Sequence, residues 1–231
     1  MEPEPHVKFF GYLFDPARWG GSDGILALCG QHLEYTLVTL LIAGVIGFPI
    51  GLYVGHTRRG VTLVVGLANA LRALPSLGIL VLLVILCGPL FTSDLAFELP
   101  SLIVLVLLAV PPIMTTTYAG IAAVDPAAVD AARGMGYRPL GIVFQVEIPC
   151  ALPFIFSGLR NATLQVISTA TIAAYASLGG LGRLIIDGRA QSDYGQMVAG
   201  AVMVGVLVIL VDFLISVVAR LMVSRGLRRI G

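Results

Sequence analysis

The sequence predicts an all-α integral membrane protein with about five transmembrane helices, and two observations support this fold class. Of the 231 residues, 58% are apolar and 12% are charged, and the mean hydropathy is +0.97. A soluble domain carries roughly 25% charged residues, so this chain has too little polar surface to cover a water-facing globule. Its apolar residues also gather in stretches of the length that crosses a bilayer, about 20 residues each. We therefore expect a multi-pass protein of the cell (cytoplasmic) membrane.

The predicted membrane spans are five long apolar stretches. In chain order they are 33–56, 62–88, 99–120, 149–178 and 195–222. The fourth is the most polar, because it contains Thr163, Gln165, Ser168, Thr169 and Thr171. At helical spacing Gln165, Ser168 and Thr169 share one face. That face either lines a path through the membrane or binds another helix through hydrogen bonds.

The chain divides into three predicted parts. Residues 1–30 form an extracytoplasmic or interfacial segment, 31–222 form the transmembrane domain, and 223–231 form a cytoplasmic tail. The aromatic stretch 7–19 is too short to span a membrane, so it forms either a helix in the interface or an ordered tail. Because so few residues lie outside the spans, we expect any solute receptor to be a separate polypeptide.

Arginine placement sets the expected orientation. Cytoplasmic loops of membrane proteins carry an excess of basic residues. With the N-terminus outside and the C-terminus inside, the cytoplasmic segments contain Arg58, Arg59, Arg133, Arg138, Arg225, Arg228 and Arg229. The loop 89–98 on the opposite side contains acidic residues and no basic one. The sequence therefore predicts an N-out, C-in topology.

Prolines interrupt three of the predicted spans. They are Pro49 in the first span, Pro75 in the second, and the pair Pro111 and Pro112 in the third. Each proline removes a backbone hydrogen bond and is expected to kink or break its helix. Broken helices near the middle of the membrane are common around the substrate sites of transporters. Three interruptions in five spans favour a translocation path.

The loop between the third and fourth spans, residues 121–149, is longer than two membrane helices need for a connection. Asp125 is a suitable N-cap and Pro126 suits the first helical position. Gly134 and Gly136 are expected to end this helix, and a second short amphipathic stretch then runs to Pro149. Long ordered loops are usually functional. We expect a cytoplasmic helix–turn–helix.

The spacing in this loop resembles the EAA motif of binding-protein-dependent ABC importers, with Asp130-Ala131-Ala132, then Gly136, then Val146-Glu147-Ile148-Pro149. Three further segments resemble the glycine betaine/carnitine/choline branch of these permeases: residues 72–78, 151–160 and 171–182. The resemblance covers about residues 31–215. It implies a MetI-like ABC permease fold with cytoplasmic coupling helices. It also implies a permease subunit that forms the path for an osmoprotectant-type solute, a quaternary amine such as glycine betaine, carnitine or choline.

The same resemblance implies both site residues and partners. It assigns coupling to an ATPase to seven residues of the loop: Asp130, Ala131, Ala132, Gly134, Gly136, Ile148 and Pro149. The implied partners are ABC ATPase subunits, a second permease chain in a homodimer or heterodimer, an extracytoplasmic solute-binding protein and the lipid bilayer. No nucleic acid is expected among them.

The scarcity of lysine indicates that the ATPase is a separate subunit. Lys8 is the only lysine, and a phosphate-binding loop of the form GxxxxGK[ST] needs one after its glycine-rich turn. We therefore expect no catalytic site and no cofactor on this chain, with ATP and Mg held by the partner ATPase. The three cysteines fit neither a disulfide framework nor a metal-ligand spacing, so no metal site is expected.

Three ionisable residues lie deep within predicted spans: Arg72, Arg160 and Asp212. Each is about ten residues, or roughly 15 Å, from the predicted cytoplasmic end of its span. Charges at such depth commonly pair inside the helix bundle. We hypothesise that Asp212 neutralises Arg160, Arg72 or both, in a bridge that is either static or rearranges during transport. The other residues assigned to the path are Pro75, Ser76, Gln165 and Thr169.

Other functions remain open at this stage. The chain is alternatively a permease for another small solute, such as an amino acid, or a stand-alone secondary transporter. An intramembrane enzyme is disfavoured, because no catalytic cluster is visible. The glycine-rich turn Gly179-Gly180-Leu181-Gly182 follows a span rather than a strand, so we interpret it as an external hinge or a close-packed re-entrant turn.

Overall fold

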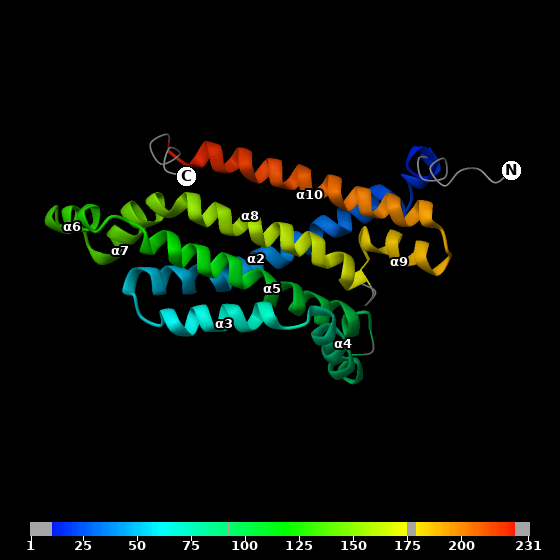
Figure 1. The fold of residues 1–231 in the computed structure, drawn as a ribbon, viewed down its shortest axis with the longest axis horizontal. Helices are drawn as coiled ribbons and strands as arrows, with labels where there is room; N and C mark the ends of the chain where they lie inside the picture. Colours follow the sequence, from blue (N-terminus) through cyan, green and yellow to red (C-terminus); the bar gives the residue numbers. More distant parts are fainter. Residues whose placement is uncertain (1–10, 92, 175–178, 225–231) are drawn as a thin grey trace. The chain divides into compact units, whose positions relative to one another are not determined.

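The computed structural model describes residues 11–91, 93–174 and 179–224, and every regular element in these ranges is helical (Figure 1). The prediction of an all-α fold is therefore confirmed. The elements are η1 (Pro16–Arg18), α2 (Ile25–Thr57), α3 (Val61–Ala73), α4 (Ser76–Cys87), η2 (Gly88–Leu90), α5 (Leu95–Ala122), α6 (Pro126–Gly134), α7 (Pro139–Ile142), η3 (Val143–Glu147), α8 (Ile148–Ala173), α9 (Gly182–Ala190) and α10 (Tyr194–Met222).

Four of these helical stretches are long and apolar enough to cross a membrane, and a broken pair makes a fifth. The four are α2, α5, α10 and the continuous helix Pro139–Ala173, which contains α7, η3 and α8. The broken pair is Val61–Ala73 with Ser76–Leu90. The predicted number of five spans is confirmed when the broken pair is counted as one span. The first span begins at Ile25 rather than at residue 33, which places His32 inside the helix.

Only one of the three predicted proline interruptions breaks a helix. Helix α3 ends at Ala73, and Pro75 is the N-cap of α4. Helix α2 instead continues through Pro49, and α5 continues through Pro111 and Pro112. Of the two expected outcomes, a kink or a break, the prolines of the first and third spans do not break their helices. A proline inside a long helix removes one hydrogen bond, and the neighbouring turns are enough to keep such a helix continuous in a membrane.

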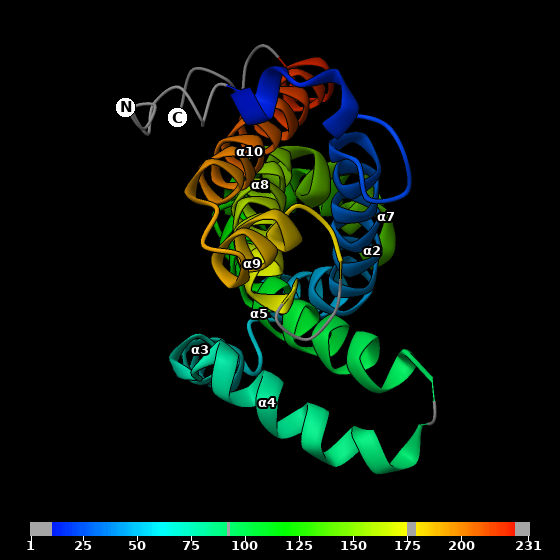
Figure 2. The same cartoon turned by 90° about the vertical axis from the view of Figure 1, so that its right-hand side faces the viewer.

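The contacts divide the chain into two compact units, which are described separately. Unit 1 contains Met1–Thr39, Leu74–Val106 and Leu164–Val211. Its main core is a cluster of buried aliphatic side chains: Ile25, Leu28, Ile167, Leu181, Leu184 and Leu207. Helix α9 lies against the first part of α10 in both Figure 1 and Figure 2, because Gly200 leaves room for Leu184 and Ile185.

The aromatic N-terminal stretch packs onto unit 1 where it is described. Residues 11–14 are helical and are followed by η1. Tyr12, Leu13 and Trp19 pack against the core cluster, and the Trp19 indole donates a hydrogen bond of 2.7 Å to the Leu13 carbonyl. Residues 7–10 lie outside the described ranges. Both alternatives drawn from the sequence, a helix in the interface and an ordered tail, therefore stay predictions.

Unit 2 contains Leu40–Ala73, Leu107–Thr163 and Asp212–Gly231, and glycines bring two of its helices into close contact. Gly47, Gly51 and Gly55 recur every fourth residue and lie on one face of α2. A Cβ atom on Gly51 would lie 2.5 Å from the Met114 carbonyl oxygen of α5. At Gly55 it would lie 2.6 Å from the Ile121 Cβ. Small residues allow such close helix packing in membranes.

Helix α8 packs equally closely on α5 within unit 2. A Cβ atom on Gly120 of α5 would lie 2.6 Å from the Phe154 Cβ of α8. In the other direction, a Cβ atom on Gly158 of α8 would overlap the Thr116 hydroxyl of α5. That hydroxyl donates to the Pro112 carbonyl at 2.7 Å. Helix α5 is therefore in contact with α2 and α8 through glycines.

Candidate functional site

The segment between α5 and α8, residues 123–147, is called the connecting segment here. Its first helix, α6, has the predicted cap, because the Asp125 carboxylate accepts a hydrogen bond of 2.9 Å from the Ala127 amide and Pro126 occupies the first turn. In Figure 1, α6 and α7 lie side by side in unit 2. The predicted helix, turn and second helix are confirmed.

The turn after α6 depends on Gly136. This residue has a φ of +85°, in the left-handed region that glycine adopts without a Cβ clash. The Tyr137 amide donates to the Ala132 carbonyl at 3.1 Å and the Gly136 amide donates to the Arg133 carbonyl at 2.9 Å. This pair of hydrogen bonds is a Schellman motif, which satisfies the last carbonyls of a helix. Gly134 lies two residues before Gly136 and is the last residue of α6.

The second half of the connecting segment differs from the prediction. The expected short stretch does not end at Pro149, because α7 continues through the π-helical turn η3 directly into α8. The Ile148 amide donates to the Val143 carbonyl, five residues earlier. Pro149 falls in the first turn of α8, where the missing amide is tolerated because the π-turn has already changed the hydrogen-bond register.

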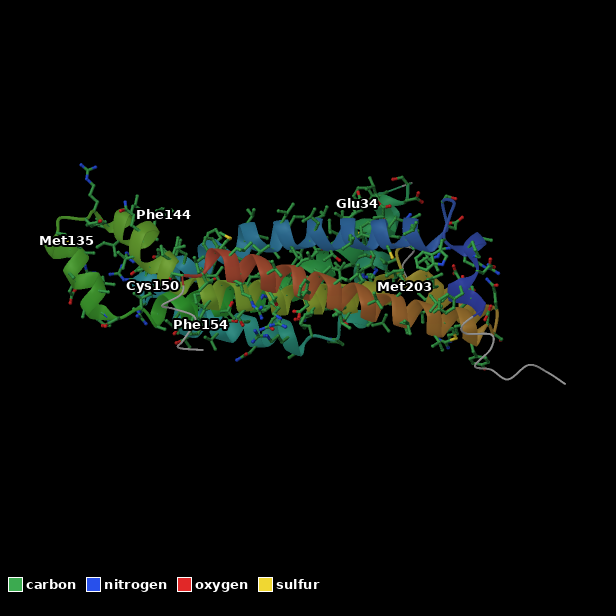
Figure 3. All side chains as sticks on the ribbon, turned by 90° about the horizontal axis from the view of Figure 1, so that it is seen from above. Glu34, Met135, Phe144, Cys150, Phe154 and Met203 are labelled. Atoms are coloured by element: carbon green, nitrogen blue, oxygen red, sulfur yellow. The ribbon has the colours of Figure 1, made fainter. Side chains whose placement is uncertain are left out.

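The tip of the connecting segment exposes large apolar side chains. Met135 is 70% exposed, Leu140 71% and Phe144 62%, and Tyr137 is also exposed. Figure 3 shows Met135 and Phe144 at the same end of unit 2. These four residues are called the apolar tip. Leu140 and Phe144 belong to the apolar helix Pro139–Ala173, whereas Met135 and Tyr137 lie in the turn before it, so the hydrocarbon of a membrane does not account for the exposure of these two.

The predicted coupling residues differ in their surroundings. Asp130 is exposed and pairs with Arg133 at 3.1 Å on the surface of α6. Ala132 is buried on the opposite face, whereas Ala131, Gly134 and Gly136 are exposed. Ile148 is half-buried and Pro149 is exposed at the start of α8. The helix thus has one packed face and one free face.

A buried carboxylate that sequence reasoning missed lies at the end of the connecting segment. The Glu147 side chain is only 8% exposed, and its Oε2 lies 2.7 Å from Nδ1 of His56 at the end of α2. Next to His56, the Arg58 guanidinium donates to the Ala122 carbonyl at 2.7 Å. The only signal in the sequence was an acidic residue between Val146 and Ile148, and its partner is 91 positions away.

The three ionisable residues assigned to spans are all in unit 2, and two of them pair. The Arg160 guanidinium forms a two-pronged ion pair with Asp212, with Nε donating to one carboxylate oxygen and Nη2 donating to the other at 2.6 Å. Arg72 donates instead to the Thr115 hydroxyl at 3.3 Å. Of the two hypothesised partners of Asp212, the structure therefore has Arg160 and not Arg72.

Some of the predicted path residues meet in a small cavity of unit 1. This cavity of about 10 Å³, close to the volume needed for a single water, is lined by Ser76 at the start of α4 and Thr169 on α8. Ser101 of α5 adds a third hydroxyl, which donates to the Phe97 carbonyl at 2.9 Å. Gln165 is half-buried and does not line this cavity. Pro75 precedes it as the N-cap of α4.

A larger cavity of about 820 Å³ in unit 2 contains none of the predicted path residues. Its walls come from the end of α5, the first turn of α6, the first half of α8 and the end of α10. Most of the lining is apolar, including Phe154 and Phe156, with Arg220 at one side. This cavity was not predicted, because it is formed by four chain segments with no shared motif.

The glycine-rich turn packs closely against α2 in unit 1. Gly179 and Gly180 have φ angles of +72° and +73°. The Gly180 amide donates to the Gln31 side chain at 3.0 Å, and a Cβ atom on Gly180 would lie 3.1 Å from the His32 ring. His32 is buried, with its Nε2 3.0 Å from the Ile167 carbonyl oxygen. Of the two interpretations, the structure therefore favours the close-packed turn.

Comparison with known proteins gives consistent results over nearly the whole chain. Residues 47–225 match the family described as "Binding-protein-dependent transport system inner membrane component". The chain is 30% identical over 204 residues to the glycine betaine/carnitine/choline transport system permease protein OpuCB of Bacillus subtilis, covering 88% of this chain and 91% of the relative. It is 31% identical over 219 residues to the osmoprotectant import permease protein OsmW of Salmonella typhimurium, covering 94% and 98%.

A likeness to a solved structure supports the fold. A chain of the MetNI methionine ABC transporter in an inward-facing conformation superposes with a TM-score of 0.74. The match covers 84% of this chain and 94% of that one, at 22% sequence identity. At this identity the likeness concerns the fold only, and it confirms the predicted architecture.

Proposed function

Because the chain belongs to the family of binding-protein-dependent transport system inner membrane components, a family of multi-pass membrane proteins, we propose that it forms the translocation path for a quaternary amine osmoprotectant. The solute class includes glycine betaine, carnitine and choline. The observation that carries this proposal is identity of about 30% over nearly the full length of permeases named for these solutes. An amino acid as the solute, or a stand-alone transporter, has no comparable support.

The proposed assembly contains several chains. Two permease chains, identical or different, form the path, and a separate binding protein delivers the solute from outside the cell. ATP and Mg are bound by separate ATPase subunits, in keeping with a single lysine, Lys8, that cannot supply a phosphate-binding loop. The N-out, C-in orientation predicted from the arginines puts the connecting segment on the ATPase side. Arg225, Arg228 and Arg229 belong to this argument but lie outside the described residues.

The connecting segment is the proposed contact with the ATPase. Its apolar tip is exposed in the turn after α6 and at the start of the helix Pro139–Ala173, and an exposed apolar surface of this kind is suited to a hydrophobic groove on a partner. Asp130 and Arg133 supply exposed charges on α6, the helix that precedes the tip. The Schellman turn at Gly136 holds α6 and α7 at a fixed angle, so a displacement of the tip is carried into α8.

The proposed path involves the intramembrane polar groups. The Arg160–Asp212 pair satisfies two charges that are costly in a membrane when unpaired. Arg72, Pro75, Ser76, Gln165 and Thr169 remain the other proposed path residues. Their polar groups suit weak contacts with a solute in transit, since a solute held tightly would leave slowly.

The test is uptake by the reconstituted transporter. The full chain is purified with its copurifying ATPase, incorporated in liposomes with ATP inside, and supplied with its cognate binding protein and labelled glycine betaine, choline, carnitine or methionine. We expect ATP-dependent uptake of at least one quaternary amine and none of methionine. Uptake of methionine alone, or uptake by this chain without an ATPase, contradicts the proposal.

A further inference from the structure

The end of α2 contacts both ends of the connecting segment. At the entry, Arg58 donates to the carbonyl of Ala122, the last residue of α5. At the exit, His56 lies 2.7 Å from Glu147, the last residue before α8. His56 in the last turn of α2 and Arg58 just after the helix thus contact the points where the connecting segment enters and leaves the bundle.

The backbone around these contacts indicates that they are specific. Arg58 has a φ of 59°, which is uncommon for a residue with a side chain. This left-handed conformation lets the chain turn after α2 while the Arg58 side chain reaches the end of α5. Glu147 ends a π-helical turn, a feature found often at functional sites. The extra residue in that turn rotates the side chains that follow, and it accompanies a carboxylate that is buried although its neighbours Gln145 and Ile148 are more exposed.

Helix α2 is itself held on α5 by its glycine face. Gly51 and Gly55 leave no room for a side chain against Thr117 and Ile121. Because α2 and α5 are packed so closely, the entry contact at Ala122 joins two helices that already move together. The exit contact is different, since the side chain of His56 links α2 to the η3–α8 junction through Glu147.

We propose that His56 and Glu147 are positioning residues that join the exit of the connecting segment to α2. A displacement of α6 and α7 by the ATPase then moves α2 together with α8, instead of α8 alone. This inference rests on the proposed function, because it needs an ATPase that moves the segment. It adds the route by which that movement reaches the first membrane helix.

The chemistry of the His56–Glu147 pair suits this positioning role. A carboxylate buried beside an imidazole is costly to separate, because either partner left alone keeps its desolvation cost. The pair therefore tends to stay together while the helices on both sides move as bodies. If the pair only stabilises the fold, its mutation lowers stability. If it also joins the connecting segment to α2, its mutation in addition prevents ATP-driven movements of the segment from reaching α2.

The test compares matched variants of the full chain in complex with its ATPase. Glu147→Leu removes the hydrogen bond but fills the same space, so no unpaired buried charge remains. His56→Leu and the double variant H56L/E147L complete a cycle, and Glu147→Gln retains the hydrogen bond. Thr57→Ala is the control, because the Thr57 hydroxyl donates only to Tyr53 of its own helix.

The first measurement is the amount of ATP hydrolysed per glycine betaine imported in liposomes. For E147L and for H56L we expect this ratio to rise about tenfold, the factor that corresponds to loss of one strong hydrogen bond. The double variant is expected to match the single ones, while E147Q and T57A stay near the wild type. Wild-type ratios in E147L and H56L, or effects that multiply in the double variant, overturn the proposal.

The second measurement does not depend on the solute. Hydrogen–deuterium exchange is followed in peptides 50–57 and 139–147 of the purified complex, without nucleotide and after trapping with ATP and vanadate. In the wild type we expect exchange in both peptides to change, and in E147L only that of 139–147. If exchange in both peptides still changes in E147L, the proposed link through His56 and Glu147 is disproved. If exchange changes as expected while no quaternary amine is imported, the proposed solute is wrong and the proposed link is supported.

Discussion

At the scale of single residues, the three ionisable side chains assigned to the spans, Arg72, Arg160 and Asp212, each have a defined partner. Arg160 and Asp212 bind one another with two hydrogen bonds, and Arg72 binds the Thr115 hydroxyl. A two-pronged pair fixes the planes of the guanidinium and carboxylate groups, which gives it geometric specificity as well as energy. It joins α8 to α10.

Replacing Asp212 with Asn should reduce uptake by about tenfold or more, because Arg160 then keeps a positive charge without a counter-charge in the membrane. Uptake and the yield of the assembled complex are measured together. The exchanged pair Arg160→Asp with Asp212→Arg should recover part of both if the bridge only fixes packing. Unchanged uptake and assembly in D212N contradict any role for the pair.

Gly136 is the second residue with a clear requirement. Its φ of +85° costs a residue with a Cβ about 1–2 kcal/mol and cannot be adopted by proline. Gly136→Ala should weaken, and Gly136→Pro should abolish, the coupling of ATP hydrolysis to uptake, while all spans stay inserted. Gly141→Ala is the matched control, since a Cβ there meets only Tyr137 at an ordinary 3.6 Å. The ratio of ATP hydrolysed to solute imported checks this, and equal ratios in G136A and G141A contradict it.

At the scale of elements, glycines set the distance between helices. On α2 they recur at Gly47, Gly51 and Gly55, and on α8 Gly158 serves the same purpose toward α5. Contacts of this kind replace the hydrophobic driving force that is missing between helices in lipid. They explain how α2 remains continuous and well packed although it contains Pro49.

Two alanine substitutions on the same helix should have opposite effects. Gly51→Ala forces a Cβ to within 2.5 Å of the Met114 carbonyl oxygen, so it should destabilise the protein by about 1–3 kcal/mol and lower the Tm in detergent. Gly44→Ala meets nothing within 4 Å and should raise stability by about 0.5–1 kcal/mol, because alanine favours helix over glycine. Equal Tm values for the two variants contradict the packing described here.

At the scale of the whole molecule, the chain presents an apolar surface on its connecting segment. The apolar tip of Met135, Tyr137, Leu140 and Phe144 belongs to the connecting segment and is exposed. Exposed apolar patches on a chain that also has membrane helices need a partner, either lipid or protein. The family of the chain makes an ATPase the proposed partner of this one.

Adding a charge to the apolar tip should weaken binding of the ATPase. Leu140→Glu should reduce the amount of ATPase that copurifies with the chain by about tenfold, because it puts a carboxylate into an apolar contact. Phe14→Glu adds the same charge at an exposed apolar residue of unit 1 and should leave copurification unchanged. The ratio of the two subunits after purification checks this. Full copurification with L140E would mean that the ATPase binds elsewhere.

The fold class and the order of the elements could be predicted because they depend on local properties. Apolar stretches of about 20 residues have to be helices in a membrane, where each backbone group needs a partner within its own segment. The cap at Asp125 and the turn at Gly136 follow from side chains and φ preferences a few residues apart. The prolines alone could not predict which helix is broken, because α2 and α5 continue through Pro49 and Pro111–Pro112, and continuity of a helix depends on its neighbours as well as on its own residues.

The sequence by itself determined that this protein is a membrane permease of helices joined by a helical connecting segment, because length, polarity and motif spacing are all local along the chain. Only the tertiary structure decided which charges meet. It paired Asp212 with Arg160 rather than Arg72, and it brought His56 to Glu147 across 91 positions. Such contacts depend on how helices pack face to face, and the closeness of α2 to α5 at Gly51 and Gly55 is visible only when both helices are in place.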